Sequence, residues 1–412
     1  MPDLTASQEI FLATVSHAHY RERYGAHLSN EVLAIIDAVY NDSKRSLTSS
    51  IESIRETYDS SDTRGRKALI ASINEALDDI YKIRSPAFAE YYEKATSDLV
   101  EFSDYEANFA SERIMSGSIA TALEGTGLAI AVAGVAGSTV YNSAIKTRTS
   151  LGNSLNGTLD SFMKNIEPYE RSRIFGMIES GLSNGLTNSQ IIKTVFDKTS
   201  GTAATTVTRR SIDTMVRTAA NAVGMAANEE TAKANSDLIR GYRNVGVFDN
   251  RQSPICKSVS LKFGDKVMPN YEDFPPVPRH PRCRSLIQMV LKSWHEILKS
   301  KKVYVEDHGE QSFFAPPAKV NAVQLTAMMK DKGMTDQQIA TFKARISGQT
   351  SATTLEGFLS EQKSRGNKDF LYSFFDSKER AQYYIDGKAT TKELFRENGT
   401  PIPLNELRDK NL

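Results

Sequence analysis

The sequence changes character at residues 249–285, which read DNRQSPICKSVSLKFGDKVMPNYEDFPPVPRHPRCRS. This stretch contains both cysteines of the chain, Cys256 and Cys283, and places His280 three residues before the second one. Its segment FPPVPRHPRC holds four prolines. Because proline fixes φ and lacks a backbone N–H, we predict an irregular loop here that other groups must hold in place. The Gly-Asp pair within Phe263–Val267 predicts a small hairpin.

The residues on both sides of this stretch predict a small α+β core over residues 205–302. A long helix is expected first, because apolar residues recur at helical spacing along one side. Short apolar runs of β character follow at Tyr242–Phe248 and Cys283–Leu291. The helix has its apolar side at Ile212, Met215, Val216, Ala219, Ala222 and Val223.

The first 145 residues indicate a helical region, because cap residues precede apolar stripes of helical period. One example is Asn30 followed by EVLAIIDAVY. Two further helices are expected on either side of Ser85-Pro86, with Pro86 in the first turn of the second one. The fold class predicted is mainly α with a small α+β core module, a helical N-terminal arm or bundle and a helical C-terminal region. The predicted divisions are 1–145, a helical connector 146–204, the core 205–302, a linker and helix 303–349, and a C-terminal region 350–412.

The charge balance and the cysteine count exclude several classes of protein. The 412-residue chain has 51 Lys and Arg against 50 Asp and Glu, which excludes a generally basic nucleic-acid coat and an acidic tail. The charges are uneven: residues 1–110 contain 11 basic and 19 acidic residues, whereas residues 205–302 contain 17 and 9. Two cysteines are too few for a disulfide scaffold.

No signal peptide or stable membrane span is expected. The first residues lack a basic region followed by an apolar one. The most apolar stretch, Leu128–Ala136 (LAIAVAGVA), is shorter than the roughly 20 residues of a membrane span. It predicts a buried helix or a tight packing element, with a short membrane-active segment as the alternative.

Cys256, His280 and Cys283 are candidate zinc ligands, because zinc takes thiolate and imidazole ligands in tetrahedral geometry. Asp249 is the nearest candidate for a fourth ligand. Such a site would hold the proline-rich loop. Three alternatives stay open: two buried cysteines with His280 bonded to backbone, a disulfide, and a nucleophile–base pair of Cys256 with His280. No oxyanion motif, phosphate loop or carboxylate pair accompanies these residues, so we expect no enzyme activity.

The basic character of residues 205–302 indicates sequence-independent contact with DNA phosphates. Aromatic residues are not interleaved with the basic ones, so stacking on single strands is not expected. The alternative is a mixture of internal salt bridges and solvated charge. The arginines proposed for DNA contact are Arg209, Arg210, Arg240 and Arg243.

The stretch resembles the phage Mu F-like family, the minor head or head morphogenesis proteins of tailed phages. The resemblance rests on Asp249, Ser253-Pro254-Ile255-Cys256, the predicted hairpin, Pro275-Pro276 and His280-Pro281-Arg282-Cys283-Arg284. Upstream, Arg217-Thr218 stands where the family has an Arg-Thr helix. This likeness makes Arg217 and Arg284 motif positions with a structural role. Residues 350–407 look like the tail that often follows this core.

The resemblance implies a structural protein that acts in capsid assembly. Its implied partners are the portal protein and capsid proteins, with packaged DNA as a further contact. Its implied location is the virion, inside the capsid or at the portal vertex, after assembly in the host cytoplasm. The alternative is a Cys/His-dependent enzyme or toxin module, because related cores are sometimes joined to effector domains.

Overall fold

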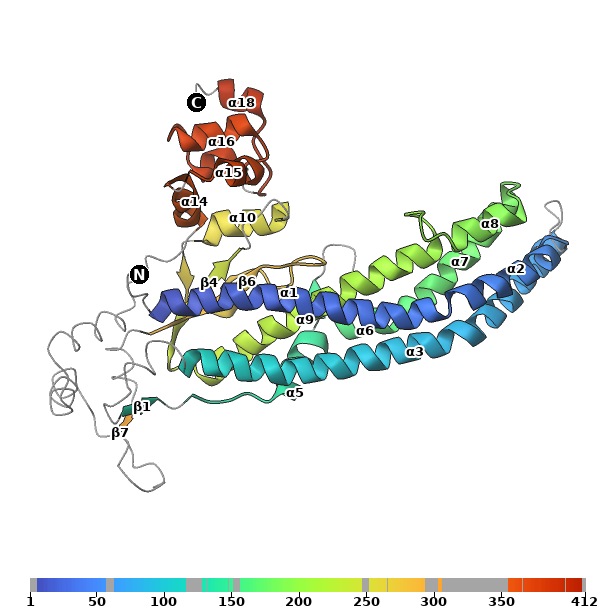
Figure 1. The fold of residues 1–412 in the computed structure, drawn as a ribbon, viewed down its shortest axis with the longest axis horizontal. Coiled ribbons are helices and arrows are strands. Elements are labelled where there is room, and N and C mark those ends of the chain that lie inside the picture. Colours follow the sequence, from blue (N-terminus) through green and yellow to red (C-terminus); the bar gives the residue numbers. More distant parts are fainter. Residues whose placement is uncertain are drawn as a thin grey trace.

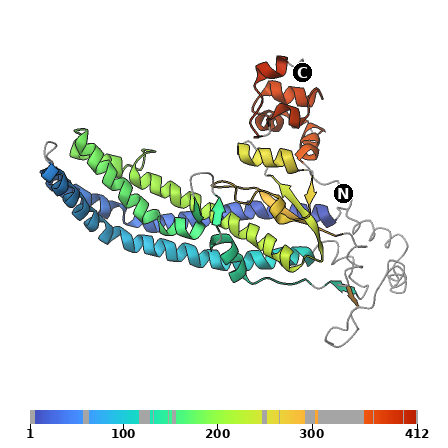
Figure 2. The ribbon, with the colours of Figure 1, turned by 180° about the vertical axis from the view of Figure 1, so that it is seen from behind.

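Long helices lie side by side in an elongated bundle, with a small sheet near one end and a group of short C-terminal helices beyond the sheet (Figure 1). The view from behind shows the same arrangement (Figure 2). This confirms the predicted class, mainly α with a small α+β module. The computed structural model describes residues 6–56, 63–115, 128–130, 132–146, 148–150, 156–246, 252–264, 266–292, 303–305, 355–364, 366–396 and 398–409.

Three long helices form the body of the bundle: α1 (Ala6–Ala38), α3 (Thr63–Met115) and α9 (Ala204–Ala234). They pack against one another along their lengths, and shorter elements complete the bundle. These elements are α2 (Tyr40–Glu56), α5 (Gly137–Tyr141), the π-helix η1 (Asn142–Lys146), α6 (Leu159–Lys164), α7 (Ile166–Ser183) and α8 (Asn188–Val195).

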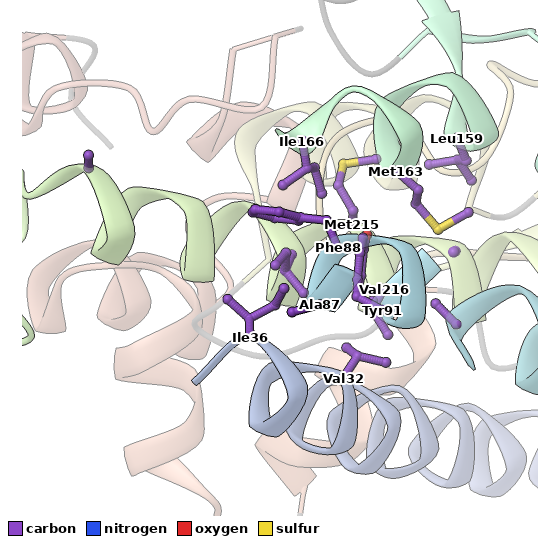
Figure 3. Packing of buried hydrophobic residues seen from close by; sticks show 14 of the residues in the cluster. Val32, Ile36, Ala87, Phe88, Tyr91, Leu159, Met163, Ile166, Met215 and Val216 are labelled. Carbon is purple, nitrogen blue, oxygen red and sulfur yellow. The ribbon is translucent and has the colours of Figure 1, made fainter. Parts of the chain in front are cut away.

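One hydrophobic core runs through the bundle. Buried apolar residues recur every three or four positions, so each helix turns one stripe inward. Figure 3 shows side chains from five helices meeting in this core. Those labelled in the figure are Val32 and Ile36 of α1, Ala87, Phe88 and Tyr91 of α3, Leu159 and Met163 of α6, Ile166 of α7, and Met215 and Val216 of α9.

The predicted break at Ser85-Pro86 is wrong, because α3 continues through Pro86 as one helix of 53 residues. Pro86 itself is exposed, and buried residues lie on both sides of it, among them Ile80 before and Phe88 after. A proline inside a helix costs about 3 kcal/mol, since it removes one backbone hydrogen bond. Burial of the stripe that continues past Pro86 offsets that cost.

A three-stranded antiparallel sheet, in the order β5–β4–β6, packs at one end of the bundle. Tyr242 in β4 pairs with Met268 on one side and with Met289 on the other. Gly241 permits the close approach of β5, because a Cβ there would lie 2.4 Å from the carbonyl oxygen of Met268. The strands are β4 (Ile239–Val245), β5 (Val267–Met268) and β6 (Leu286–Leu291).

The two β-like runs of the sequence therefore form paired strands, although Val247 and Phe248 lie outside the described residues. The predicted hairpin at Phe263–Val267 is wrong. Phe263 is the last residue of helix α10 (Pro254–Phe263), and Val267 begins a strand that pairs with β4 instead. The Gly-Asp signal marks the end of a helix, where glycine is also common. A 3₁₀ turn, η2, follows at Tyr271–Asp273.

In its described residues, the apolar stretch Leu128–Ala136 does not form a buried helix, the first of the two structures expected for it. Its first residues are strand β1 (Leu128–Ile130), which pairs with β7 (Val303–Val305). Residues 132–136 have no regular structure. A second short pair joins β2 (Arg148–Ser150) and β3 (Asn156–Thr158). None of the helices in the described part of the chain combines the length and hydropathy of a membrane crossing.

Short helices after residue 354 form a separate hydrophobic cluster, which we call the C-terminal unit (described residues 355–364, 366–396 and 398–409). Its buried residues include Phe374, Phe375 and Leu407. The helices are α14 (Leu355–Ser364), α15 (Lys368–Phe374), α16 (Lys378–Ile385), α17 (Thr391–Leu394) and α18 (Leu404–Asp409). The unit lies on the side of α10 that faces away from the bundle (Figures 1 and 2).

The predicted division between residues 204 and 205 lies at the first turn of α9. Because α9 shares the core of α1, α3 and α7, the predicted 205–302 unit is packed continuously with the helices before it. The acidic N-terminal helices of residues 1–110 and the basic segment 205–302 therefore pack against each other within one chain.

Candidate metal centre

Cys256 is positioned by the start of α10. Ser253 is the N-cap residue, and its Oγ accepts a hydrogen bond from the backbone N–H of Cys256 at 3.2 Å. Pro254 occupies the first turn, where its missing N–H costs nothing. Cys256 thus sits in the first helical turn, where the helix dipole favours a thiolate. The segment Ser253–Cys256 of the family motif is thus a capped helix start.

His280 and Cys283 belong to one tight turn. The backbone N–H of Cys283 donates to the carbonyl of His280 at 3.0 Å, and Arg282 between them has a φ of 57°, in the left-handed region. Helix α9 holds this turn in place. The Asn221 side-chain amide donates to the Cys283 carbonyl at 2.6 Å, and the Thr218 hydroxyl accepts from the Arg282 N–H at 2.8 Å.

The two turns bring the three candidate ligands together. The Cys256 and Cys283 Sγ atoms lie 3.6 Å apart, and His280 Nε2 lies 3.1 Å from Cys256 Sγ. Both cysteines are free and buried, whereas His280 is half-buried. Three ligand atoms, all within 4.8 Å of one another, are a group that can hold a metal ion.

The imidazole of His280 is oriented for ligation. Its Nδ1 lies 2.8 Å from the carbonyl oxygen of Pro281, which only accepts hydrogen bonds, so Nδ1 carries the proton. Nε2 then presents its lone pair to the cysteines. A backbone carbonyl on the second ring nitrogen is the usual support of a metal-binding histidine. Nε2 is also 2.8 Å from the Ser253 hydroxyl.

The charges within the cluster favour one thiolate. The hydrogen bond from Cys283 lowers the pKa of Cys256 well below its ordinary value, and bonds with His280, Ser285 and Ser253 act in the same direction against burial. The same hydrogen bond, together with burial, raises the pKa of Cys283. The hydrogen bond to Cys256 raises the pKa of His280. A metal cation would displace the protons that these groups share.

A cavity of about 20 Å³ adjoins two of the three candidate ligands, Cys256 and His280. A single water needs roughly 10–15 Å³ of such space, so the cavity fits one ion or one water. The lining residues are Gln252, Ser253, Cys256, His280, Arg282, Arg284 and Ser285. Cys256 and His280 lie at hydrogen-bond distance, which is the geometry that the nucleophile–base alternative requires.

The other motif residues lie in different positions. Arg217 on α9 donates from Nε to Asp213 at 2.6 Å. Asp213 also accepts from the Ser29 hydroxyl of α1 at 2.8 Å and forms an ion pair with Arg282. Arg217 is therefore part of an ion-pair network around Asp213, whereas Arg284 lines the cavity. Asp249, the predicted fourth ligand, lies outside the described residues.

The four arginines proposed for DNA contact do not form one surface. Arg209 is paired with Asp37 of α1, and Arg210 donates to the Gly201 carbonyl at 2.8 Å. Arg243 is only 6% exposed, so the expectation that it contacts DNA is corrected: a buried side chain offers phosphate no surface. Arg240 on β4 is exposed.

Sequence reasoning missed the residues that support the centre. Ser253 has a readable signal, because Ser-Pro before an apolar run is typical of a capped helix start. Thr218 was named only as a position of the family motif, and Asn221 has no signal, since the role of both depends on which loop packs against α9. Comparison with models of known protein families, with curated proteins and with solved structures found no match for this chain.

Proposed function

We propose that Cys256, His280 and Cys283 bind one zinc ion, which fastens the proline-rich loop to α10. The observation that carries this proposal is the 3.6 Å separation of the two Sγ atoms. Two thiolates at about 2.3 Å from a tetrahedral zinc ion are about 3.8 Å apart. The ligands are therefore close to the required spacing before any metal enters.

A fastening role fits the chemistry of the loop. Its prolines donate no backbone hydrogen bonds, and the segment between η2 and β6 has little backbone pairing of its own. Metal–ligand bonds supply the cross-link that backbone pairing does not. The placement of the three residues, which join the first turn of α10 to the His280–Cys283 turn, supports this structural role over the alternative of a Cys/His-dependent enzyme or toxin.

At the level of the whole protein, we infer a structural minor head protein of a tailed phage that acts in capsid assembly. Support comes from the His280-Pro281-Arg282-Cys283-Arg284 motif, whose ligand residues converge with Cys256. The elongated bundle supplies long helical surfaces for contact with a portal or capsid protein (Figure 1). On this proposal the protein is located in the virion after assembly in the host cytoplasm. DNA contact is a minor part of the proposal, carried by the exposed Arg240.

Zinc is tested by metal analysis of purified protein. We expect one zinc per chain in the wild type and none in Cys283→Ser or His280→Ala. His27→Ala is the matched control, because the His27 side chain is 71% exposed and lies on α1, outside the centre. Cobalt substitution adds a second readout, since thiolate ligands produce a strong charge-transfer absorption. The proposal would be contradicted if wild-type protein that is refolded in the presence of added zinc contains no bound zinc.

The head-protein role is tested by co-expression with the portal protein encoded in the same genome. We expect the two chains to copurify and the protein to be found in assembled heads. Heads that assemble normally without the protein and never contain it would contradict this function, and would leave the zinc proposal unaffected.

A further inference from the structure

Helix α10 is shared by two neighbours. Its first turn carries the ligand Cys256, whereas the next residue, Lys257, points into the C-terminal unit. Consecutive residues of a helix lie about 100° apart around its axis, so one short helix can serve both sites. Figure 1 shows α10 between the sheet and the C-terminal helices.

Lys257 is the anchor between α10 and the C-terminal unit. It is only 6% exposed, and its Nζ donates to the Phe374 carbonyl at 3.3 Å. Asp376 is its ion-pair partner at 3.4 Å. The ammonium also lies over two rings, 4.6 Å from the centroid of Phe395 and 5.1 Å from that of Phe374. A buried ammonium needs such partners, so the position of Lys257 is closely specified.

The C-terminal unit also contacts the first turn of α10, which carries Cys256. Gly399 has a φ of +78°, and a Cβ there would lie 2.1 Å from the Pro254 carbonyl oxygen and 2.6 Å from the Ser258 nitrogen. The backbone of the C-terminal unit therefore packs directly on the first turn of α10. Leu261, one turn further along, packs against the hydrophobic cluster of the unit.

We propose that zinc and the C-terminal unit bind α10 cooperatively. The proposal rests on the zinc site proposed above. Zinc ties the first turn of α10 to the His280–Cys283 turn, and this same first turn is the surface on which Gly399 packs. Loss of the metal releases that turn and weakens docking of the unit. Because coupling between two binding events is reciprocal, docking also raises the affinity for zinc.

The test uses the full chain and two glycine variants. Gly399→Ala places a Cβ in the contact with Pro254. Gly387→Ala is the matched control, because Gly387 is in the same unit, has a φ of +73°, and has open space around its Cβ position. We expect Gly399→Ala to weaken zinc binding about fivefold or more in a chelator competition, a typical size for coupling between sites. Gly387→Ala should stay within about twofold of the wild type, since it adds only local strain.

A second measurement works on the wild type alone. Hydrogen exchange of residues 366–396 should speed up when a chelator removes zinc and recover when zinc is restored. Equal zinc affinity in both glycine variants, or exchange that does not change on chelation, would overturn the coupling while leaving the zinc site in place. Failure of the wild type to bind zinc would overturn the proposed function and, with it, the coupling.

Discussion

The Sγ atoms of Cys256 and Cys283 lie 3.6 Å apart although the two residues are 27 positions apart in the chain. Two local features of the fold produce this proximity. The cap at Ser253 starts α10 and places Cys256 in its first turn, and Asn221 of α9 holds the carbonyl of Cys283. The centre thus depends on the bundle as well as on its own loop.

Zinc removal should destabilise the fold around the centre. A ligand present at 100 times its dissociation constant stabilises the folded state by roughly 2.7 kcal/mol. We therefore expect a chelator to lower the thermal midpoint of the wild type and to have no effect on Cys283→Ser. Calorimetry with and without chelator measures both. An equal shift in the variant would show that the chelator acts elsewhere.

The buried ion pair of Arg84 and Glu170 should be costly to break. Both side chains are at most 1% exposed, and Arg84 makes two bonds to the carboxylate, of 2.6 and 3.0 Å. Removing one partner leaves a buried charge, which costs about 3–5 kcal/mol. Glu170→Gln should therefore lower the free energy of unfolding by about that amount in urea titrations.

An exposed ion pair on α3, the helix that carries Arg84, provides the control. Asp79→Asn removes the partner of Lys82, whose side chain is 74% exposed, and should cost less than about 1 kcal/mol. Equal losses in the two variants would contradict the assigned difference in burial.

The ionisation of Asp213 should make the stability of the fold depend on pH. Burial acts to raise its pKa, but hydrogen bonds from Arg217 and Ser29 and the charge of Arg282 outweigh burial, and its pKa lies below the ordinary value of 3.8. The folded state therefore favours the carboxylate. The stability that this adds is present above the unfolded-state pKa and is lost as the pH falls through the lower folded-state pKa.

The measurement compares wild type with Asp213→Asn. The difference in their urea midpoints should be largest near neutral pH and should shrink below about pH 4. A difference that grows on acidification would reverse the sign and contradict the argument.

Pro86→Ala should stabilise the bundle. Alanine restores the backbone N–H that can donate to the Lys82 carbonyl one turn earlier in α3, and Pro86 is exposed, so no core packing is lost. We expect a gain of about 1–3 kcal/mol in the free energy of unfolding, reduced by the greater freedom of the unfolded chain. Glu90→Ala, at another exposed position of α3, should change stability by less than about 0.5 kcal/mol.

DNA binding by the full chain should be weak. Arg209 is paired with Asp37, and Arg243 is buried, so few phosphate contacts remain. Titration of labelled duplex at low and high salt should give a shallow salt dependence, reduced further by Arg240→Ala. The full chain is required, because a fragment that begins at residue 205 would expose the apolar face of α9. Tight, steeply salt-dependent binding would contradict this expectation.

Local patterns were sufficient to predict α9, β4 and β6 and to single out the candidate ligands. Apolar spacing in residues 212–223 predicted α9, and β-like runs predicted β4 and β6, because each pattern reflects one buried face of one element. The joint presence of Cys256, His280 and Cys283 in one irregular stretch predicted that the three side chains lie close together, as they do. These features depend on residues that are near one another in the chain or are chemically rare.

Packing between distant segments settled the rest. Pro86 is tolerated inside α3 because buried residues on both sides extend the core past it, which no local rule for proline can reveal. The Gly-Asp signal at residue 264 ends a helix instead of joining strands because β4 already pairs with β6 and takes β5 on its other edge. Arg209 and Arg243 are neutralised or buried by neighbours far away in the chain. Likewise, the contacts of Lys257 with the C-terminal unit follow from its burial there, and neither its burial nor its partners can be derived from the neighbouring sequence.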